Sequence, residues 1–110
     1  MPTIEETIGA TPLIELRRSL SESARDRGNL IFGKWECVNP SASIKDRVVK
    51  SMIDEAEARG TIHPGDTLIE ASKGNTGIAL AMQAAARGYR CILIMPENTA
   101  VFKQQCMGVY

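Results

Sequence analysis

Alternating hydrophobic and polar residues mark a β-strand near the start of the chain. Residues 29–36 follow this pattern and contain Ile31, Phe32 and Trp35. A period of two residues is typical of a strand, because successive side chains point to opposite faces. Residues 11–16 follow a turn signal at Gly9 and predict a second, shorter strand.

From residue 45 the spacing of the hydrophobic residues changes to that of a helix. We predict a helix over residues 45–59, with Ser43 as its N-cap and Gly60 as its end. Glu55 and Arg59 stand four residues apart, so we expect an ion pair on the solvent side. The apolar face recurs at intervals of one, three and four residues and comprises Val48, Val49, Met52, Ile53 and Ala56.

The next part of the chain has the pattern of a strand, a crossover helix and a second strand. The strands are predicted over residues 67–71 and 89–95, and an Ala-rich helix is predicted over residues 78–87. A turn at 72–77 precedes that helix, and Gly88 closes it. Such a unit forms a parallel strand pair with a right-handed crossover, which places the chain in the α/β class. A further helix is predicted over residues 102–107.

Composition and charge restrict the function. The chain has 110 residues, of which 44% are hydrophobic and 24% are charged, as in a globular domain. Thirteen basic residues balance thirteen acidic ones, which argues against nucleic acid or an anionic membrane as a partner. No stretch has the features of a signal peptide or a membrane span, so a cytoplasmic location is expected.

The cysteines and the single histidine do not have the spacing of a disulfide framework or a metal site, so no metal is expected. Cys91 lies in the apolar run 91–95, where we expect a buried small side chain. A catalytic thiol at Cys37 is the less favoured interpretation of that residue. His63 precedes Pro64 and is interpreted as a turn residue.

The turn Ser72–Gly77 has the composition of an anion-binding loop. It leads from a strand into a helix, where backbone N–H groups point at a ligand. Ser72 and Thr76 add hydroxyls, and Asn75 adds an amide. The loop matches neither the dinucleotide nor the nucleoside triphosphate motif. Local chemistry fits a carboxylate or a phosphate, and it fits equally well a turn that only caps the helix.

Lys45 is a candidate amine nucleophile at the start of the first predicted helix. Such a lysine can form a Schiff base with a carbonyl compound or with pyridoxal phosphate. Helix N-termini usually favour acidic residues, so a lysine is unusual there. Charge arguments alone favour the alternative, an exposed first-turn lysine next to Asp46.

Taken together, these two segments resemble a known family. Residues 39–47 read Asn-Pro-Ser-Ala-Ser-Ile-Lys-Asp-Arg, and residues 70–77 read Glu-Ala-Ser-Lys-Gly-Asn-Thr-Gly. Both resemble the fold-type II pyridoxal-phosphate enzymes, and within them the cysteine synthases (O-acetylserine sulfhydrylases) of the B type. The resemblance extends over essentially the whole chain and includes residues 7–13, 62–66, 85–89 and 95–98.

The resemblance implies a three-layer α/β parallel-sheet fold like that of the tryptophan synthase β-subunit. Residues 1–40 would begin the larger domain, and residues 41–110 would form part of the smaller one. The implied reaction is the β-replacement that converts O-acetylserine and sulfide to cysteine. It also implies a homodimer, and a partner in serine acetyltransferase, whose C-terminal tail enters the substrate-carboxylate loop.

The resemblance also implies roles for individual residues. Lys45 would bind the pyridoxal phosphate cofactor as a Schiff base and later move protons at the substrate α-carbon. Asn75 would bind the cofactor's ring hydroxyl. Ser72, Lys73, Asn75 and Thr76 belong to the loop that would hold the carboxylate of the amino-acid substrate.

Three features depart from the family pattern. Lys73 replaces the usual serine, which predicts altered or impaired substrate binding, although its side chain could also pair with a phosphate leaving group or point to solvent. Ser72 replaces threonine but keeps the hydroxyl. Residues 99–109 lack the usual polar start of a helix, with Ala100 and Phe102 at polar positions.

The family is also much longer, and its cofactor-phosphate loop lies outside these residues. We therefore expect the N-terminal part of a cysteine-synthase-like enzyme that does not turn over by itself. Alternatives are a non-catalytic module that keeps the acetyltransferase docking surface, a truncated product without function, and relatives such as cystathionine β-synthase or threonine dehydratase. The absence of a haem-binding extension before residues 7–13 favours cysteine synthase over the haem-containing enzymes.

Overall fold

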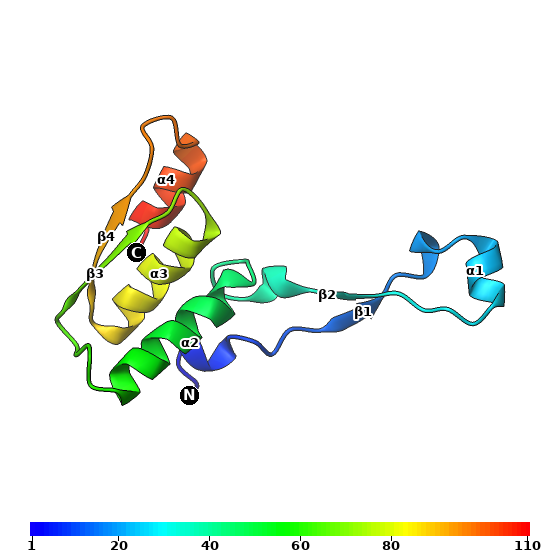
Figure 1. Ribbon diagram of the computed structural model, residues 1–110, viewed down its shortest axis with the longest axis horizontal. Coiled ribbons are helices and arrows are strands. Elements are labelled where there is room, and N and C mark those ends of the chain that lie inside the picture. The colour runs from blue at the N-terminus through cyan, green and yellow to red at the C-terminus, as the bar shows by residue number, and fades with distance from the viewer.

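The computed structural model describes all 110 residues and contains two separate pieces of sheet (Figure 1). The first is an antiparallel hairpin of β1 (Leu13–Glu15) and β2 (Phe32–Lys34), in which Ile14 lies opposite Gly33. Both strands were predicted, but each is shorter than its hydrophobic pattern. Between them, Ser21 caps the short helix α1 (Glu22–Asp26) by accepting from the Ala24 N–H at 3.3 Å; this helix was not predicted.

The hairpin extends away from the rest of the molecule (Figure 1). The radius of gyration is 17.7 Å, whereas a compact domain of this length has about 13 Å. Leu13, Phe32 and Trp35 are about half exposed or more, at 62%, 50% and 49%. The apolar residues of the hairpin therefore contribute little to the core of these 110 residues.

The second sheet is the predicted parallel pair, β3 (Thr67–Ala71) and β4 (Arg90–Ile94), joined by α3 (Asn75–Arg87). Thr67 lies opposite Arg90, and the register continues to the pair of Ala71 and Ile94. Gly88 closes α3 in the left-handed conformation at φ +77°, as expected. The helix begins three residues earlier than predicted, because residues 75–77 form its first turn rather than a separate loop.

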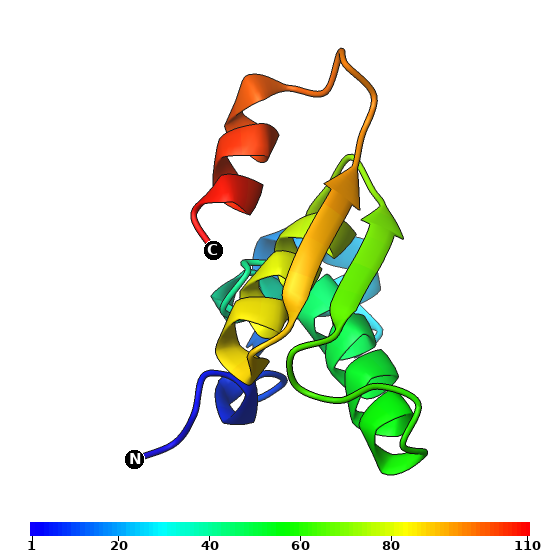
Figure 2. The same cartoon turned by 90° about the vertical axis from the view of Figure 1, so that its left-hand side faces the viewer.

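Helix α2 (Lys45–Ala58) lies beside α3 and runs in the same direction (Figures 1 and 2). Gly60, at φ +68°, follows its end, and the predicted Glu55–Arg59 ion pair is present. Ser43 is not the N-cap, because Ile44 occupies that position without a side-chain cap; the Ser43 hydroxyl instead accepts from the Lys45 N–H at 3.2 Å.

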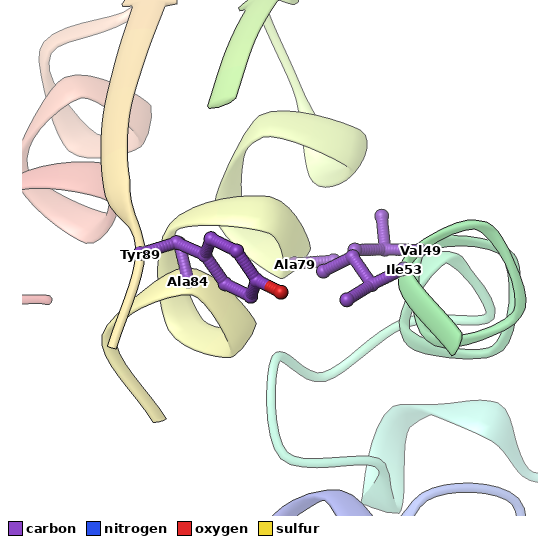
Figure 3. Close-up of a cluster of buried hydrophobic side chains, with 5 residues drawn as sticks. All are labelled: Val49, Ile53, Ala79, Ala84 and Tyr89. Carbon is purple, nitrogen blue, oxygen red and sulfur yellow. The ribbon is translucent and has the colours of Figure 1, made fainter. Parts of the chain in front are cut away.

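The main core cluster joins these two helices. Figure 3 shows the side chains of α2 and those of α3 and the residue after Gly88 pointing toward one another. Half-buried Leu68 and Cys91 extend the cluster to the strands, so Cys91 packs as a small apolar side chain, less buried than expected. The cluster comprises Val49, Ile53, Ala79, Ala84 and Tyr89.

Helix α4 (Val101–Gly108) packs on α3 through the buried Met107, whose sulfur would lie 3.3 Å from a Cβ added at Gly77. The helices lie on one face of the β3–β4 pair, and the opposite face exposes Ile69, Ile92 and Ile94 (Figure 2).

Three single-turn 3₁₀ helices complete the chain: η1 (Glu5–Thr7), η2 (Arg17–Ser19) and η3 (Glu36–Val38). None of the helices combines the length and apolar character needed to cross a membrane.

Candidate functional site

The segment before Lys45 is shaped by short-range hydrogen bonds. Asn39 is buried, and its amide donates to the backbone carbonyls of Glu36 at 2.9 Å and Ser43 at 3.0 Å. Ala42 adopts a left-handed conformation at φ 62° and is the one non-glycine residue with a positive φ. These contacts define the path by which the chain enters α2.

The carboxylate of Asp46, next to Lys45 in the sequence, binds Ser41 and does not pair with Lys45. The Asp46 side chain is completely buried and accepts hydrogen bonds from the Ser41 N–H at 2.7 Å and from the Ser41 hydroxyl. Lys45 is half buried, and its Nζ has no ion-pair or hydrogen-bond partner in the chain. The alternative favoured by charge arguments was an exposed first-turn lysine next to Asp46; Lys45 does lie in the first turn of α2, but it is half buried and does not pair with Asp46.

The residue after Asp46 anchors α2 to the N-terminal segment. Arg47 binds both carboxylate oxygens of Glu36, at 2.8 and 3.0 Å, and also donates to the Gly9 carbonyl at 2.8 Å. Thr11 donates to the same carboxylate at 2.8 Å. The hydrogen bond from Arg47 is the main cause that lowers the pKa of Glu36 to about 2. The start of α2 is thus held both by the loop that precedes Lys45 and by the contacts of Arg47 with the N-terminal segment.

The predicted anion loop leads into the N-terminus of α3. The Ser72 hydroxyl oxygen accepts from the N–H groups of Gly74 at 3.3 Å and Gly77 at 3.0 Å, so it caps the helix. The N–H groups of Lys73, Asn75 and Thr76 have no acceptor in the chain. Three donors at a helix N-terminus, where the helix dipole is positive, are available to an anion.

The side chains of the loop are also available. Asn75 is exposed and Thr76 is half buried, and neither makes a side-chain hydrogen bond. Lys73 is exposed and forms no ion pair. A second cation comes from α4, because a Cβ added at Gly74 would lie 3.7 Å from the Lys103 Nζ.

The helices bring the two predicted segments to the same end of the unit. α2 and α3 run in the same direction, and both begin at the end nearer the loop (Figure 1). Gln83, in α3, donates from Nε2 to the Asp46 carbonyl at 2.9 Å. Further along, Arg87 pairs with Asp54 at 2.7 Å and with Glu57 at 3.0 Å. These contacts hold the helix carrying Lys45 against the helix that follows the loop.

Sequence reasoning missed Gln83, Arg87 and the Glu36–Arg47 pair. A signal for Gln83 was present, since it is the one polar residue in the apolar stretch 78–86. Tyr89 was also missed: its hydroxyl donates to Glu57 at 2.8 Å, and burial, followed by that carboxylate, raises its pKa. The ion pairs have no comparable signal, because their partners are 11 to 33 residues apart in the sequence.

The residues present fit a cofactor that carries an aldehyde and anionic groups. An amine without a counter-ion can attack a carbonyl carbon, and the open N–H groups can accept an anion. Comparison with known proteins gives the same answer. A family model described as "Pyridoxal-phosphate dependent enzyme" matches residues 4–110. The chain belongs to this family.

Individual members of the family are similar over nearly the whole chain. "Cysteine synthase B" of Pseudomonas syringae pv. syringae is 53% identical over 108 residues, covering 98% of this chain and 62% of that protein. "Cysteine synthase B" of Escherichia coli (strain K12) is 52% identical over 110 residues, covering 100% and 35%. The crystal structure of O-ureido-L-serine synthase superimposes with a TM-score of 0.90 at 40% identity, covering 100% of this chain and 33% of that one.

These comparisons establish the fold as that of the fold-type II pyridoxal-phosphate enzymes, within which the chain provides an α/β piece with a parallel strand pair. The chain spans about a third of the length of the E. coli relative and of the solved structure, and under two thirds of the P. syringae relative.

Proposed function

We propose that this chain forms the N-terminal part of a cysteine synthase, which makes cysteine from O-acetylserine and sulfide. The observation that carries the proposal is the unpaired amine of Lys45, at the start of α2, together with the open first N–H groups of α3, the helix that lies beside α2. Identities of 52% and 53% to two proteins named cysteine synthase B support this reaction over others of the family. The similarity to O-ureido-L-serine synthase supports a substrate of the same class, an amino acid derived from serine.

All the predicted residues except Lys73 have a role in this proposal. Lys45 binds pyridoxal phosphate through its Nζ and moves the proton at the substrate α-carbon. Asn75 donates its amide to the cofactor's ring hydroxyl, and Thr76 donates to the substrate carboxylate together with the open N–H groups of the loop. When bound, the cofactor supplies an electron sink for the carbon that loses its proton.

Ser72 has a structural role in addition to its proposed contact with the substrate. Its oxygen already accepts from two N–H groups of the loop. Its own proton remains free to be donated to a carboxylate, because a hydroxyl can do both. Ser72 therefore has two roles: its oxygen shapes the loop, and its proton is available to the substrate carboxylate.

These 110 residues do not turn over by themselves in this proposal, because they span about a third of the length of the E. coli relative and of the solved structure. Residues 1–40 begin the larger domain and residues 41–110 belong to the smaller one, a division supported by the hairpin that extends away from the α/β unit. The protein that contains this chain is cytoplasmic and dimeric, and the loop after β3 receives the tail of serine acetyltransferase.

A substrate with an anionic leaving group is the second candidate. Lys73 is exposed at the loop, and the Lys103 amine lies close to Gly74. Two cations would favour O-phosphoserine over O-acetylserine through charge attraction. Titrating each compound while following the loop amides by NMR tests this preference. O-phosphoserine should bind more tightly, and Lys103→Ala should reduce the difference; equal binding of both compounds contradicts the second candidate.

The main proposal is tested by adding pyridoxal phosphate to the purified chain and recording the visible absorption band of lysine-bound cofactor. We expect a band that is lost in Lys45→Ala and kept in Lys73→Ala, the matched loop variant. A band that persists in Lys45→Ala overturns the role of Lys45. Cysteine formation from O-acetylserine and sulfide by these 110 residues alone would show that the claim about turnover is wrong.

The docking of serine acetyltransferase needs a separate test. A peptide with the sequence of the enzyme's C-terminal tail is titrated into the chain by calorimetry. Binding that weakens in Thr76→Ala supports docking at the loop. No heat change at any concentration contradicts it.

A further inference from the structure

Gln83 makes an unusual contact for a buried side chain. It is completely buried in α3, and its Nε2 donates to the backbone carbonyl of Asp46 at 2.9 Å. A carbonyl oxygen can only accept, so the contact fixes which end of the Gln83 amide faces α2. The other end, Oε1, is buried and has no hydrogen-bond partner. One side chain thus forms a link between the helices and leaves an acceptor unsatisfied.

The link ends on the peptide next to Lys45. Asp46 is held from two sides, since its carboxylate accepts from Ser41 and its carbonyl accepts from Gln83. In an α-helix that carbonyl also accepts from the N–H four residues later, so the Gln83 bond is additional to the helix itself. Its effect is to fix the position of the first turn of α2 relative to α3.

The remaining polar links between the two helices lie toward the C-terminal end of α2. Arg87 binds Asp54 and Glu57, in the last turns of α3 and α2. Without Gln83, these ion pairs and the apolar cluster would still join the helices. The first turn of α2, however, would have no hydrogen bond to α3. That turn carries Lys45, the first residue of α2.

We infer that Gln83 is a positioning residue that sets the place of Lys45 relative to the loop at the start of α3. This inference rests on the proposed role of Lys45 as the cofactor lysine. About two turns of helix separate Gln83 from Asn75, so the side chain acts through the backbone and contacts neither cofactor nor substrate.

Because Gln83 Oε1 has no partner, a substitution at Gln83 can release the first turn of α2 without lowering the stability of the chain. A buried acceptor without a partner lowers stability, and methionine has a similar shape without that acceptor. In Gln83→Met the midpoint of thermal unfolding should therefore not fall. The first turn of α2 should nevertheless lose its link to α3.

The experiment has two readouts on the 110-residue chain. The first is hydrogen exchange at the amides of the first turn of α2, without cofactor. The second is the rate at which pyridoxal phosphate and borohydride label Lys45, relative to the exposed Lys73. In Gln83→Met we expect exchange to become about three- to tenfold faster, and the labelling ratio to fall by a similar factor, as for the loss of one hydrogen bond.

Gln104→Met is the matched control. It removes another glutamine amide that donates to a backbone carbonyl, that of Thr99 at 2.7 Å, far along the chain from Lys45. Both readouts should stay at their wild-type values. Unchanged exchange and an unchanged labelling ratio in Gln83→Met overturn the inference, as does an equal effect of Gln104→Met.

Two further outcomes keep the test decisive. If Gln83→Met does not fold, Gln83→Glu replaces it, since a carboxyl group donates only while protonated. Exchange in that variant should match the wild type at low pH and become faster as the carboxyl ionises; a ratio to wild type that does not vary with pH overturns the inference. Failure of the wild-type chain to label Lys45 faster than Lys73 overturns the proposed function itself, which distinguishes the two claims.

Discussion

Arg47 and Glu36 form an ion pair with two hydrogen bonds, and this pair joins the start of α2 to the segment that precedes it. The same guanidinium reaches the Gly9 carbonyl and the Thr11 hydroxyl. Two residues after Lys45, the chain is therefore tied to three points that lie 11 to 38 residues earlier in the sequence. This contact predicts how stability depends on pH.

Stability should fall when Glu36 is protonated. The Arg47 hydrogen bond lowers the pKa of Glu36 from its ordinary value of 4.5 to about 2. The folded state thus favours the ionised form, and the contribution to stability is full above pH 4.5 and is lost as the pH falls toward 2. The urea midpoint measured across that range should decrease. Glu36→Gln should have a lower midpoint at pH 6 and a shallower decrease, whereas Glu55→Gln, in an exposed pair, should follow the wild type.

Gly9 should tolerate no side chain. Its φ is +95°, and a Cβ would lie 3.0 Å from the Arg47 Nη1. Gly65 has the same φ but nothing within 4 Å of a Cβ, so it isolates the backbone strain from the steric contact. We expect Gly9→Ala to lower the free energy of unfolding by more than about 1 kcal/mol. Chemical denaturation should show a smaller loss for Gly65→Ala; equal losses would mean that the contact with Arg47 has no cost.

Removal of the Ser72 hydroxyl should destabilise α3. In Ser72→Ala the N–H groups of Gly74 and Gly77 lose their acceptor, which costs about 0.5–2 kcal/mol. Ser72→Thr keeps the hydroxyl and should lose little. Ser51→Ala is the control, since Ser51 is exposed on α2. Urea denaturation measures all three, and a Ser72→Ala chain as stable as the wild type would show that the hydroxyl does not cap the helix.

Arg87 should contribute more to stability than an exposed arginine. Its side chain is 9% exposed and binds Asp54 and Glu57, which are themselves 44% and 36% exposed. Because these carboxylates are partly hydrated, we expect Arg87→Met to cost about 1–2 kcal/mol rather than the full value for a buried pair. Arg59→Met, which removes an exposed pair with Glu55, should cost less than about 1 kcal/mol. Equal costs in thermal unfolding would contradict a special role for Arg87.

Helices α2, α3 and α4 and the parallel strands could be predicted because their signals are local. The apolar spacing of residues 48–56, the glycines at 60 and 88, and the two apolar strands are each readable within a few residues. The start of α3 was predicted too late, because the Gly-Asn-Thr-Gly segment has the composition of a turn. The Ser72 hydroxyl accepts from the Gly77 N–H, and the helix therefore begins at Asn75.

Other features depend on contacts between distant residues. Asp46 lies next to Lys45 in the sequence, yet its carboxylate binds Ser41 and is completely buried. Ala42 has a positive φ, and nothing about an alanine in the sequence predicts that conformation. For these reasons the surroundings of Lys45 required the structure, although the lysine itself was identified from its motif.

Reductive labelling of the lysines shows directly whether Lys45 is the residue that binds pyridoxal phosphate. The chain has five lysines, whose surroundings differ: Lys34, Lys45, Lys50, Lys73 and Lys103. Lys34 donates to the Thr11 carbonyl and Lys50 pairs with Asp54, whereas Lys45 has no partner. Limiting pyridoxal phosphate is added to the chain, borohydride traps the adducts, and peptide mass spectrometry locates them. Lys45 should carry most of the label; label spread evenly over the exposed lysines, or concentrated on Lys73, would rule out Lys45 as the cofactor lysine.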